Sequence, residues 1–389
     1  MAVALALALP TALFLVEVVS AVVLRNRDSI VSNAGLRQRV GVLVPAHNES
    51  VGLLPTLADV KAQMQPGDRL VVVADNCSDD TALIAREAGA EVVERNDPER
   101  KGKGYALARG LDYFSAHEPD VLIVIDADCR LAACTIDQLA AVCAMTRRPV
   151  QALDLMIAPA ESTINLKVAE FAWRIKNWVR PLGLRALGLP CQLMGTGMAF
   201  RWDLIASVNL AHGSLVEDLR LGHELAVVGC APVFCPSAQV TSVFPSSAAG
   251  QQTQRLRWER GHISLMLRTA PRLVYRAITC RNWSLLALAL DLSVPPLFFL
   301  AMLVVTMLGI SGLAAVVGLS AMAFVISAIS TTALAAGIFI SWWKFGRDVL
   351  PRGGIWSLAC YACGKLPLYF RIFSGRPAPE WIRTERRGR

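Results

Sequence analysis

The sequence predicts an α/β domain with a mostly parallel sheet flanked by helices, joined to apolar helices long enough to cross a membrane. Between residues 40 and 130, short apolar runs alternate with amphipathic segments, which is typical of parallel strands joined by helical crossovers. Of the 389 residues, 54% are hydrophobic and 18% are charged, a balance that is apolar for a soluble protein. Polar side chains follow several expected strands, so we expect a ligand site at the carboxyl edge of the sheet.

The first apolar segment covers residues 2–24, is interrupted only by Glu17, and is long enough to span a bilayer. Basic residues follow it, whereas a secretory signal carries its positive charge before the apolar core. The positive-inside bias therefore predicts a transmembrane helix over 1–25, with its N-terminus outside and the next domain in the cytoplasm. A carboxylate is costly inside a membrane, so we expect Glu17 to face another helix.

The α/β pattern begins at residue 40. The first strand is expected to end at Pro45, because proline cannot donate a hydrogen bond to a neighbouring strand. Each later strand follows a segment with helical periodicity. The expected strands cover 40–44, 70–74, 91–94 and 121–125, and the expected helices cover 51–64, 79–88 and 101–116.

The strand over 121–125 is the centre of the predicted site. Its residues are all apolar, as expected for a strand that is buried on both faces. Asp126 and Asp128 follow at once, at the edge where open α/β sheets bind ligands. Carboxylate oxygens suit Mg²⁺ or Mn²⁺ held together with substrate phosphates. The same two acids are also compatible with a strand end that is simply solvated.

Other element ends bring polar side chains to the same edge. Glu49 follows the first strand and Asp75 ends the second. Lys101 and Lys103 alternate with glycines at a helix start, where free N–H groups and the helix dipole favour phosphate. The sequence has neither a Gly-x-Gly-x-x-Gly run after the first strand nor a Walker A motif, which argues against a dinucleotide dehydrogenase and a P-loop NTPase.

Three further motifs lie in the second half of the chain. A glycine-bearing loop, Gly195-Thr-Gly197, leads into a strand. Glu217-Asp218 begins a leucine-rich helix, and an acidic first turn is also an ordinary feature that the helix dipole favours. Gln254-Arg-Leu-Arg-Trp258 lies on a basic helix, and the same pattern fits an amphipathic helix that presses its tryptophan into a core. None of these motifs is sufficient by itself to predict a functional site, so the prediction depends on their occurring together.

The C-terminal third is predominantly apolar. Residues 283–343 contain one charged side chain, Asp291, and basic residues flank them on both sides, so we expect two cytoplasmic flanks and two transmembrane helices. We place those helices over 284–308 and 313–341. The region 354–389 is expected to form an interfacial or re-entrant helix and a basic cytoplasmic tail.

The net charge indicates the kind of partner, and the cysteines indicate the redox state that we expect. The net charge is +8, and the basic residues lie near apolar segments, which favours contact with membrane lipids over nucleic acid. Residues 163–180 mix tryptophans with basic residues and fit a membrane-interface helix or a core helix equally well. The ten cysteines show no paired metal spacing and are interpreted as reduced packing residues.

Taken in order, these motifs resemble those of the membrane-bound glycosyltransferases of family 2, the group that includes cellulose, chitin and hyaluronan synthases. The resemblance covers roughly residues 38–270 and implies a cytoplasmic GT-A-like domain there. The chain departs from the family pattern at Ala74, often aspartate, and at Val216, often threonine. The matching motifs are Pro45-Ala-His-Asn-Glu49, Asp75 with Asp79, Lys101-Gly-Lys-Gly104, Asp126-Ala-Asp128, Gly195-Thr-Gly197, Glu217-Asp218 and Gln254-Arg-Leu-Arg-Trp258.

The resemblance implies a role for each motif. In the family, the residue that matches Asp128 holds Mg²⁺ or Mn²⁺ beside the donor. The residue that matches Asp218 is the general base that activates the acceptor. The other implied donor-binding residues are Glu49, Asp75, Lys103, Asp126, Gln254, Arg257 and Trp258. The implied acceptor-binding residues are Gly195, Thr196, Gly197, Glu217 and again Trp258.

These roles predict a membrane-bound inverting glycosyltransferase that moves a sugar from a UDP-sugar to a glycan acceptor, in exopolysaccharide or cell-envelope polysaccharide synthesis. The chemistry is consistent, because glycosyl transfer needs a stabilised diphosphate leaving group and a base for the acceptor hydroxyl. The alternative is a single transfer to a lipid acceptor, ceramide-like or polyprenyl-linked. A different class is a membrane scaffold that binds nucleotide sugars without turnover, although every acidic residue that the chemistry needs is present.

Overall fold

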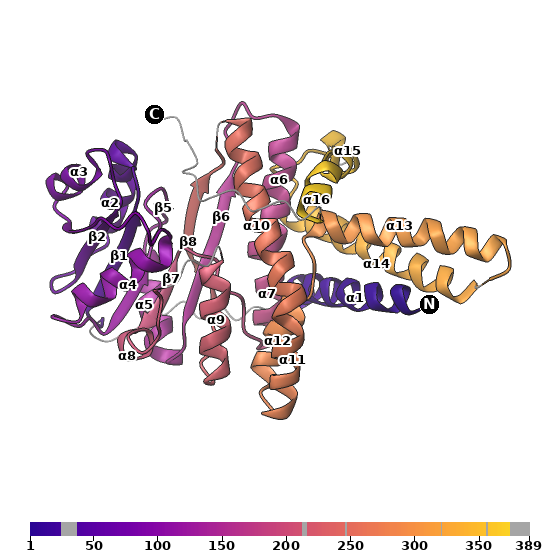
Figure 1. The fold of residues 1–389 in the computed structure, drawn as a ribbon, viewed down its shortest axis with the longest axis horizontal. Coiled ribbons are helices and arrows are strands. Elements are labelled where there is room, and N and C mark those ends of the chain that lie inside the picture. The colour runs from indigo at the N-terminus through magenta and orange to yellow at the C-terminus, as the bar shows by residue number, and fades with distance from the viewer. Residues whose placement is uncertain (25–36, 212–215, 246, 320, 355–356, 374–389) are drawn as a thin grey trace. The chain divides into compact units, whose positions relative to one another are not determined.

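The computed structural model describes residues 1–389 except 25–36, 212–215, 246, 320, 355–356 and 374–389 (Figure 1). The described chain divides into two compact units. The tail predicted after residue 373 lies outside the described residues. The sheet unit contains the described residues of 28–157 and 191–254, and the helical unit contains those of 1–27, 158–190 and 255–378.

The sheet unit is built on one mixed sheet with the strand order β3-β2-β1-β4-β7-β6-β8-β5. Strands β3, β2, β1 and β4 are parallel, as predicted. Strand β7 is antiparallel to both β4 and β6, and β8 is parallel to β6 and antiparallel to β5. The strands are β1 Val40–Ala46, β2 Arg69–Asp75, β3 Glu91–Arg95, β4 Val121–Val124, β5 Arg130–Leu131, β6 Val150–Ile157, β7 Met198–Arg201 and β8 Val233–Val243.

Strand β1 does not end at Pro45, as the sequence suggested, but continues to Ala46. The Ile125 N–H donates to the Leu43 carbonyl, so Leu43 directs its backbone groups towards β4. Pro45 is two residues further along and directs its backbone the same way. The pairing of β1 with β4 ends at Leu43, so no hydrogen bond in the sheet is lost where proline lacks its N–H.

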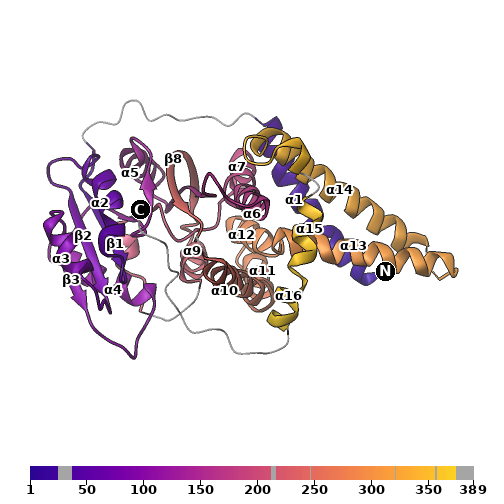
Figure 2. The same cartoon turned by 90° about the horizontal axis from the view of Figure 1, so that it is seen from above.

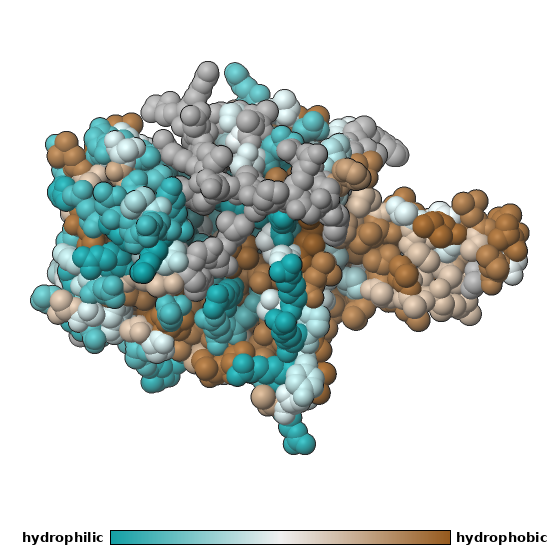
Figure 3. All heavy atoms as spheres, viewed as in Figure 1, coloured by the Kyte–Doolittle hydropathy of each residue, from teal (hydrophilic) through white to brown (hydrophobic). Residues whose placement is uncertain are grey.

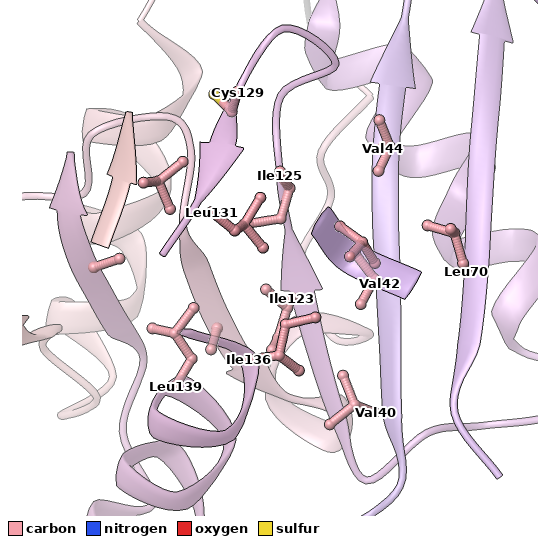
Figure 4. Close-up of a cluster of buried hydrophobic side chains, with 14 of the residues drawn as sticks. Val40, Val42, Val44, Leu70, Ile123, Ile125, Cys129, Leu131, Ile136 and Leu139 are labelled. Atoms are coloured by element: carbon pink, nitrogen blue, oxygen red, sulfur yellow. The ribbon is translucent and has the colours of Figure 1, made fainter. Parts of the chain in front are cut away.

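Apolar side chains alternate between the two faces of the sheet and form one buried cluster on each face. Val42 and Ile123 lie in the cluster shown in Figure 4, whereas Leu43 and Leu122 lie in the other. Helices therefore cover both faces (Figure 2). The first cluster is covered by α2 Leu54–Lys61, α3 Thr81–Glu87 and α5 Thr135–Thr146, and the second by α4 Lys103–Phe114, α8 Trp202–Ile205 and α9 Glu217–Val227.

Three helices of the helical unit, among the described residues, are long and apolar enough to cross a membrane: α1, α13 and α14. The exposed surface of α13 and α14 is largely hydrophobic (Figure 3). The helices are α1 Ala2–Val23, α6 Ile164–Arg174, a π-helical turn Ile175–Val179, α7 Arg180–Ala186, α11 Ala270–Thr279, α12 Trp283–Leu292, α13 Leu297–Val316, α14 Ala321–Phe345, α15 Ser357–Gly364 and α16 Leu366–Phe373. Helix α10, Ala248–Arg268, contributes residues to both units.

The predicted bounds of the C-terminal helices were wrong. The chain continues as helix through Ser311, whose hydroxyl donates to the Met307 carbonyl one turn earlier, and α13 ends at Val316. The earlier break occurs at Pro295-Pro296, because proline cannot continue a helix from its preceding turn. Residues 283–345 therefore form the short helix α12 and two long helices. Residues 357–373 form two short helices that meet at Lys365.

Helices α1 and α14 pack side by side in the same direction. A Cβ atom at Gly337 would lie 2.7 Å from the Phe14 ring, and Val19 to Val23 share a groove with Phe339 to Lys344. The two helices therefore run parallel, and their C-terminal ends are adjacent. Helix α13 also packs against α14, which follows it after a short connection.

Glu17 does face other helices, as its cost in an apolar span suggested. Its carboxylate accepts a hydrogen bond of 2.5 Å from the Arg180 Nε, at the start of α7. The same guanidinium pairs with the carboxylate of Asp291 on α12. All three side chains are buried. One guanidinium thus joins α1, α7 and α12 by pairing with a carboxylate from each of the other two helices.

Candidate active site

Residues from four predicted motifs meet beyond the carboxyl end of β4, three through side chains and the glycine-bearing loop through its backbone. The Lys103 Nζ donates to the Asp126 carboxylate and, over 2.7 Å, to the Gly195 carbonyl. Gly195 also lies beside Asp218, because a Cβ atom at this glycine would be 3.4 Å from the Asp218 Oδ2. Glu217 is near enough to Lys103 for its charge to raise the pKa of the lysine. These five residues define the acidic cluster of the sheet unit.

One cation and three carboxylates determine the electrostatics of the acidic cluster. Burial alone would lower the pKa of Lys103, but the charges of Asp126, Glu217 and Asp218 raise it above its ordinary value, so the ammonium keeps its proton. Glu217 behaves differently. Burial, together with the charge of Asp218, raises the pKa of Glu217 to about 7, although Lys103 opposes the shift.

Contacts that the sequence did not reveal hold the turn that carries Asp126. The Thr56 hydroxyl, on α2, lies 2.7 Å from both the Ala127 and the Cys129 carbonyl oxygens. The Asp126 N–H donates to the Thr196 hydroxyl over 3.0 Å, which ties the turn to the glycine-bearing loop. Backbone that is fixed from both sides presents the neighbouring carboxylates with little freedom, as a preorganised ligand site requires.

The loop over residues 194–197 is held by Gln151, a buried amide on β6. Its Nε2 donates to the Thr196 carbonyl over 2.8 Å, and its Oε1 accepts the Met194 N–H over 2.8 Å. Gly197 has a φ of +64°, and a Cβ atom there would lie 2.7 Å from the Ala152 Cβ. Glycine is thus required by both the backbone conformation and the close packing. The only sequence signal for Gln151 is a polar residue inside an apolar strand.

Asp75 is the last residue of β2, and Glu49 follows the end of β1 by three residues. The Arg95 Nη1 donates to the Asp75 Oδ1 over 2.6 Å, and the Arg95 guanidinium lies over the Tyr105 ring. The Glu49 N–H donates to the Thr81 hydroxyl, which fixes the start of the helical turn after β1. Arg95 is a site residue that the sequence reasoning missed, although its position at the end of β3 was the available signal.

The donor atoms suit a hard divalent cation. Asp126 and Asp128 are separated by one residue on a fixed turn, and the Asp126 side chain is 36% exposed. Among the residues that the structure describes, no group of three or more histidine, cysteine or acidic side chains could hold a metal ion. A pair of carboxylates fits Mg²⁺ or Mn²⁺, which complete their coordination with water and substrate phosphates, better than a structural zinc ion.

The remaining predicted residues lie on α10, which contributes to both units. Gln254 is a buried residue of the sheet unit, whereas Arg257 and Trp258 belong to the helical unit. The Trp258 ring packs against Trp173 of α6, with 4.8 Å between ring centroids. This contact is the packing role that an amphipathic helix predicts. The donor and acceptor roles of Gln254, Arg257 and Trp258 stay predictions.

The mixed sheet with helices on both faces and acids at its carboxyl edge defines a GT-A-like fold. The chain belongs to the family described as Glycosyltransferase like family 2, whose model matches residues 37–261. The mannosyltransferase PcManGT from Pyrobaculum calidifontis, solved in complex with GDP-Man and Mn²⁺, has the same fold. That comparison has a TM-score of 0.50 and 16% sequence identity, and it covers 88% of this chain and 99% of the other.

Two named relatives are similar to parts of this chain. A Bacillus subtilis (strain 168) protein described as "Probable glycosyltransferase YdaM" is 28% identical over 248 residues, which cover 59% of this chain and 56% of that protein. The 4,4'-diaponeurosporenoate glycosyltransferase of Staphylococcus haemolyticus (strain JCSC1435) is 37% identical over 98 residues, or 24% of this chain and 25% of the relative. The chain thus spans about half of the first relative and about a quarter of the second.

Proposed function

We propose that this chain is a membrane-bound inverting glycosyltransferase that moves a sugar from a nucleoside diphosphate sugar to an acceptor hydroxyl. The observation that carries the proposal is the acidic cluster. Lys103, Asp126 and Asp218 come from separate parts of the chain and meet at the edge where this fold binds ligands. Family membership supports the reaction class.

In the proposed reaction, Asp218 accepts the proton of the acceptor hydroxyl while the hydroxyl oxygen attacks the anomeric carbon of the donor. The bond from that carbon to the diphosphate oxygen breaks, and the nucleoside diphosphate leaves. The Lys103 ammonium, already among carboxylates, provides positive charge near the leaving group. A divalent cation held by Asp128 with Asp126 would neutralise further charge on the diphosphate. Gly195 to Gly197 and Glu217 shape the acceptor side.

The donor base is proposed to be uracil, with Glu49 and Asp75 as its contacts. The resemblance to the polysaccharide synthases supports UDP, and the ion pair of Asp75 with Arg95 would hold that carboxylate in one orientation. PcManGT, in contrast, is described with GDP-Man, so the guanine nucleotide is the natural competitor in an assay. Mn²⁺ in the same structure supports a divalent cation, and Mg²⁺ is the second candidate.

The acceptor is proposed to be a growing glycan of an exopolysaccharide or cell-envelope polysaccharide. Single transfer to a lipid acceptor is a second candidate, because three helices of the described chain are long and apolar enough to lie among lipids. The name of the Staphylococcus haemolyticus relative gives 4,4'-diaponeurosporenoate as what it glycosylates. In both cases we place the catalytic domain in the cytoplasm, from the positive-inside bias of the flanking basic residues.

The deciding experiment measures nucleoside diphosphate release by the purified full chain in lipid vesicles, with UDP-sugars and GDP-mannose, with Mn²⁺, Mg²⁺ or neither. We expect UDP release that requires a divalent cation and is lost in Asp218→Asn. Release of GDP but not UDP would overturn the donor assignment. Binding of nucleotide sugars without release in any condition would favour the scaffold. Product length then separates a polymer from a singly glycosylated lipid.

A further inference from the structure

A groove of about 370 Å³ lies between the C-terminal ends of α1 and α14, outside the residues assigned to sugar transfer. Its walls include Val19 and Val23 from α1 and Phe339 and Ile340 from α14, and Lys344 lies at its edge. Apart from that lysine, the lining side chains are apolar. The volume lies within the range of small-molecule sites, and the walls suit a hydrocarbon chain.

Two basic side chains lie at the same end of the groove. Lys344 lines it directly, and the Arg347 guanidinium lies 4.5 Å from the centre of the Trp343 ring, which also lines it. Both basic side chains are exposed, and no carboxylate among the described residues pairs with either. Asp348, the acid beside Arg347, is instead paired with Arg174 over 2.8 Å. The groove therefore combines an apolar trough with uncompensated positive charge at one end.

We propose that this groove binds one anionic phospholipid, with an acyl chain between α1 and α14 and the headgroup phosphate between Lys344 and Arg347. Helices that span a bilayer leave such a groove filled by acyl chains, and basic sites between spans on the cytoplasmic side select anionic headgroups. With α14 inserted, Trp343 would lie near the end of the span, where tryptophan is favoured between the apolar core and the headgroups. The long lysine stem reaches that level from the end of its helix.

The lipid would also stabilise the packing of α1 against α14. The two helices run in the same direction and are far apart in the sequence, so packing and not a short connection brings their C-terminal ends together. In the proposed complex, the acyl chain contacts the last turns of both α1 and α14, and the headgroup holds the lipid at Lys344 and Arg347. The inference rests on the proposed insertion of these helices in a membrane and is independent of sugar transfer.

The test measures lipid binding to the purified full chain after delipidation, by native mass spectrometry during titration with phosphatidylglycerol or phosphatidylcholine. We expect phosphatidylglycerol to bind at least about tenfold more tightly. In the double variant Lys344→Gln/Arg347→Gln, the affinity for phosphatidylglycerol falls to that for phosphatidylcholine. The control Arg272→Gln/Arg276→Gln removes the same charge from exposed positions of α11 and leaves the preference intact.

A second pair of variants tests the groove while keeping its charge. Ile340→Trp fills the trough and weakens binding of both lipids, whereas Ile329→Trp, at a 63% exposed position three turns earlier on α14, does not. Equal affinity for the two lipids in the wild type, or equal effects of the two tryptophans, would overturn the proposal. Displacement of phosphatidylglycerol by an equimolar amount of a polyprenyl phosphate would also overturn the proposal, because the groove would then bind an acceptor lipid.

Discussion

Asp218→Asn tests the proposed base most directly, and Glu217→Gln is the matched variant at the neighbouring position of α9. In the structure, the Leu219 N–H donates a hydrogen bond of 2.8 Å to the Asp218 Oδ1. Asparagine keeps the shape of the aspartate and an oxygen that can accept this hydrogen bond. It removes the charge that would take the proton of the acceptor. Because general base catalysis contributes about 10²–10⁴-fold, we expect kcat to fall by that order while nucleotide affinity changes little.

Glu217→Gln has a different expected effect because the pKa of Glu217 is about 7. Below that pH the wild-type side chain is predominantly neutral, like glutamine, and above it a second negative charge appears beside Asp218. The wild-type pH–rate profile should therefore contain an ionisation near pH 7 that is absent in Glu217→Gln. In the residual activity of Asp218→Asn the same ionisation should move to lower pH, because the charge of Asp218 no longer raises the pKa of Glu217. At about pH 6 the glutamine variant should turn over within a factor of about three of the wild type.

The assay is nucleoside diphosphate release in lipid vesicles from about pH 5 to about pH 9, beside equilibrium binding of the nucleotide by tryptophan fluorescence. Near-normal turnover by Asp218→Asn would refute the base assignment. Loss of nucleotide binding as complete as the loss of rate would make Asp218 a donor or structural residue. In either case the base would have to be Glu217, and an ionisation near pH 7 that survives in Glu217→Gln would refute the account of that residue.

Four further predictions follow from single positions. Burial raises the pKa of Glu217 from 4.5 to about 7, so the wild-type free energy of unfolding should fall by at most about 3 kcal/mol between those pH values, and denaturant titrations of Glu217→Gln should lack that fall. Asp128→Ala should lose turnover and the response to Mn²⁺ with unchanged circular dichroism, and a variant that still responds to Mn²⁺ would contradict the metal assignment. Gly197→Ala should cost about 1–3 kcal/mol more than Gly229→Ala, whose Cβ meets nothing within 4 Å, and equal losses in thermal denaturation would exclude the steric cause. A topology reporter inserted after Gly318 should be active outside the cell, and one at the C-terminus should be silent; the reverse pattern would contradict the orientation.

The parts of the site that the sequence predicted are those set by local order along a strand. Asp126 follows a run of apolar residues that predicts a buried strand, and Asp75 ends another, so their place at the carboxyl edge could be predicted from the sequence. Lys103 was expected near phosphate because of the glycines around it. Its pairing with Asp126 was not expected, since that contact depends on how α4 lies against β4.

Residues that position others through contacts between distant segments gave almost no sequence signal. Thr56 lies in an ordinary helix, and nothing local indicates that its hydroxyl reaches two carbonyls of the turn after β4. Gln151 is visible only as a polar residue in an apolar strand, and Arg95 only as a charge at a strand end. The helix bounds near Ser311 were missed because serine can satisfy its hydroxyl within the helix.

The orientation of the membrane helices has two independent supports of different kinds. The positive-inside bias predicts that the segments after residue 24 and after residue 344 lie on the same side of a membrane, because both carry positive charge. The packing of α1 with α14 requires the same result without any reference to charge, since Phe14 meets Gly337 and the C-terminal ends of both helices line one groove. If both helices span a membrane, this packing requires their C-terminal ends to share a side, and the basic flanks predict which side that is. If α1 and α14 both span, a reporter after Gly318 and one directly after α14 must give opposite signals, whichever way the protein is inserted.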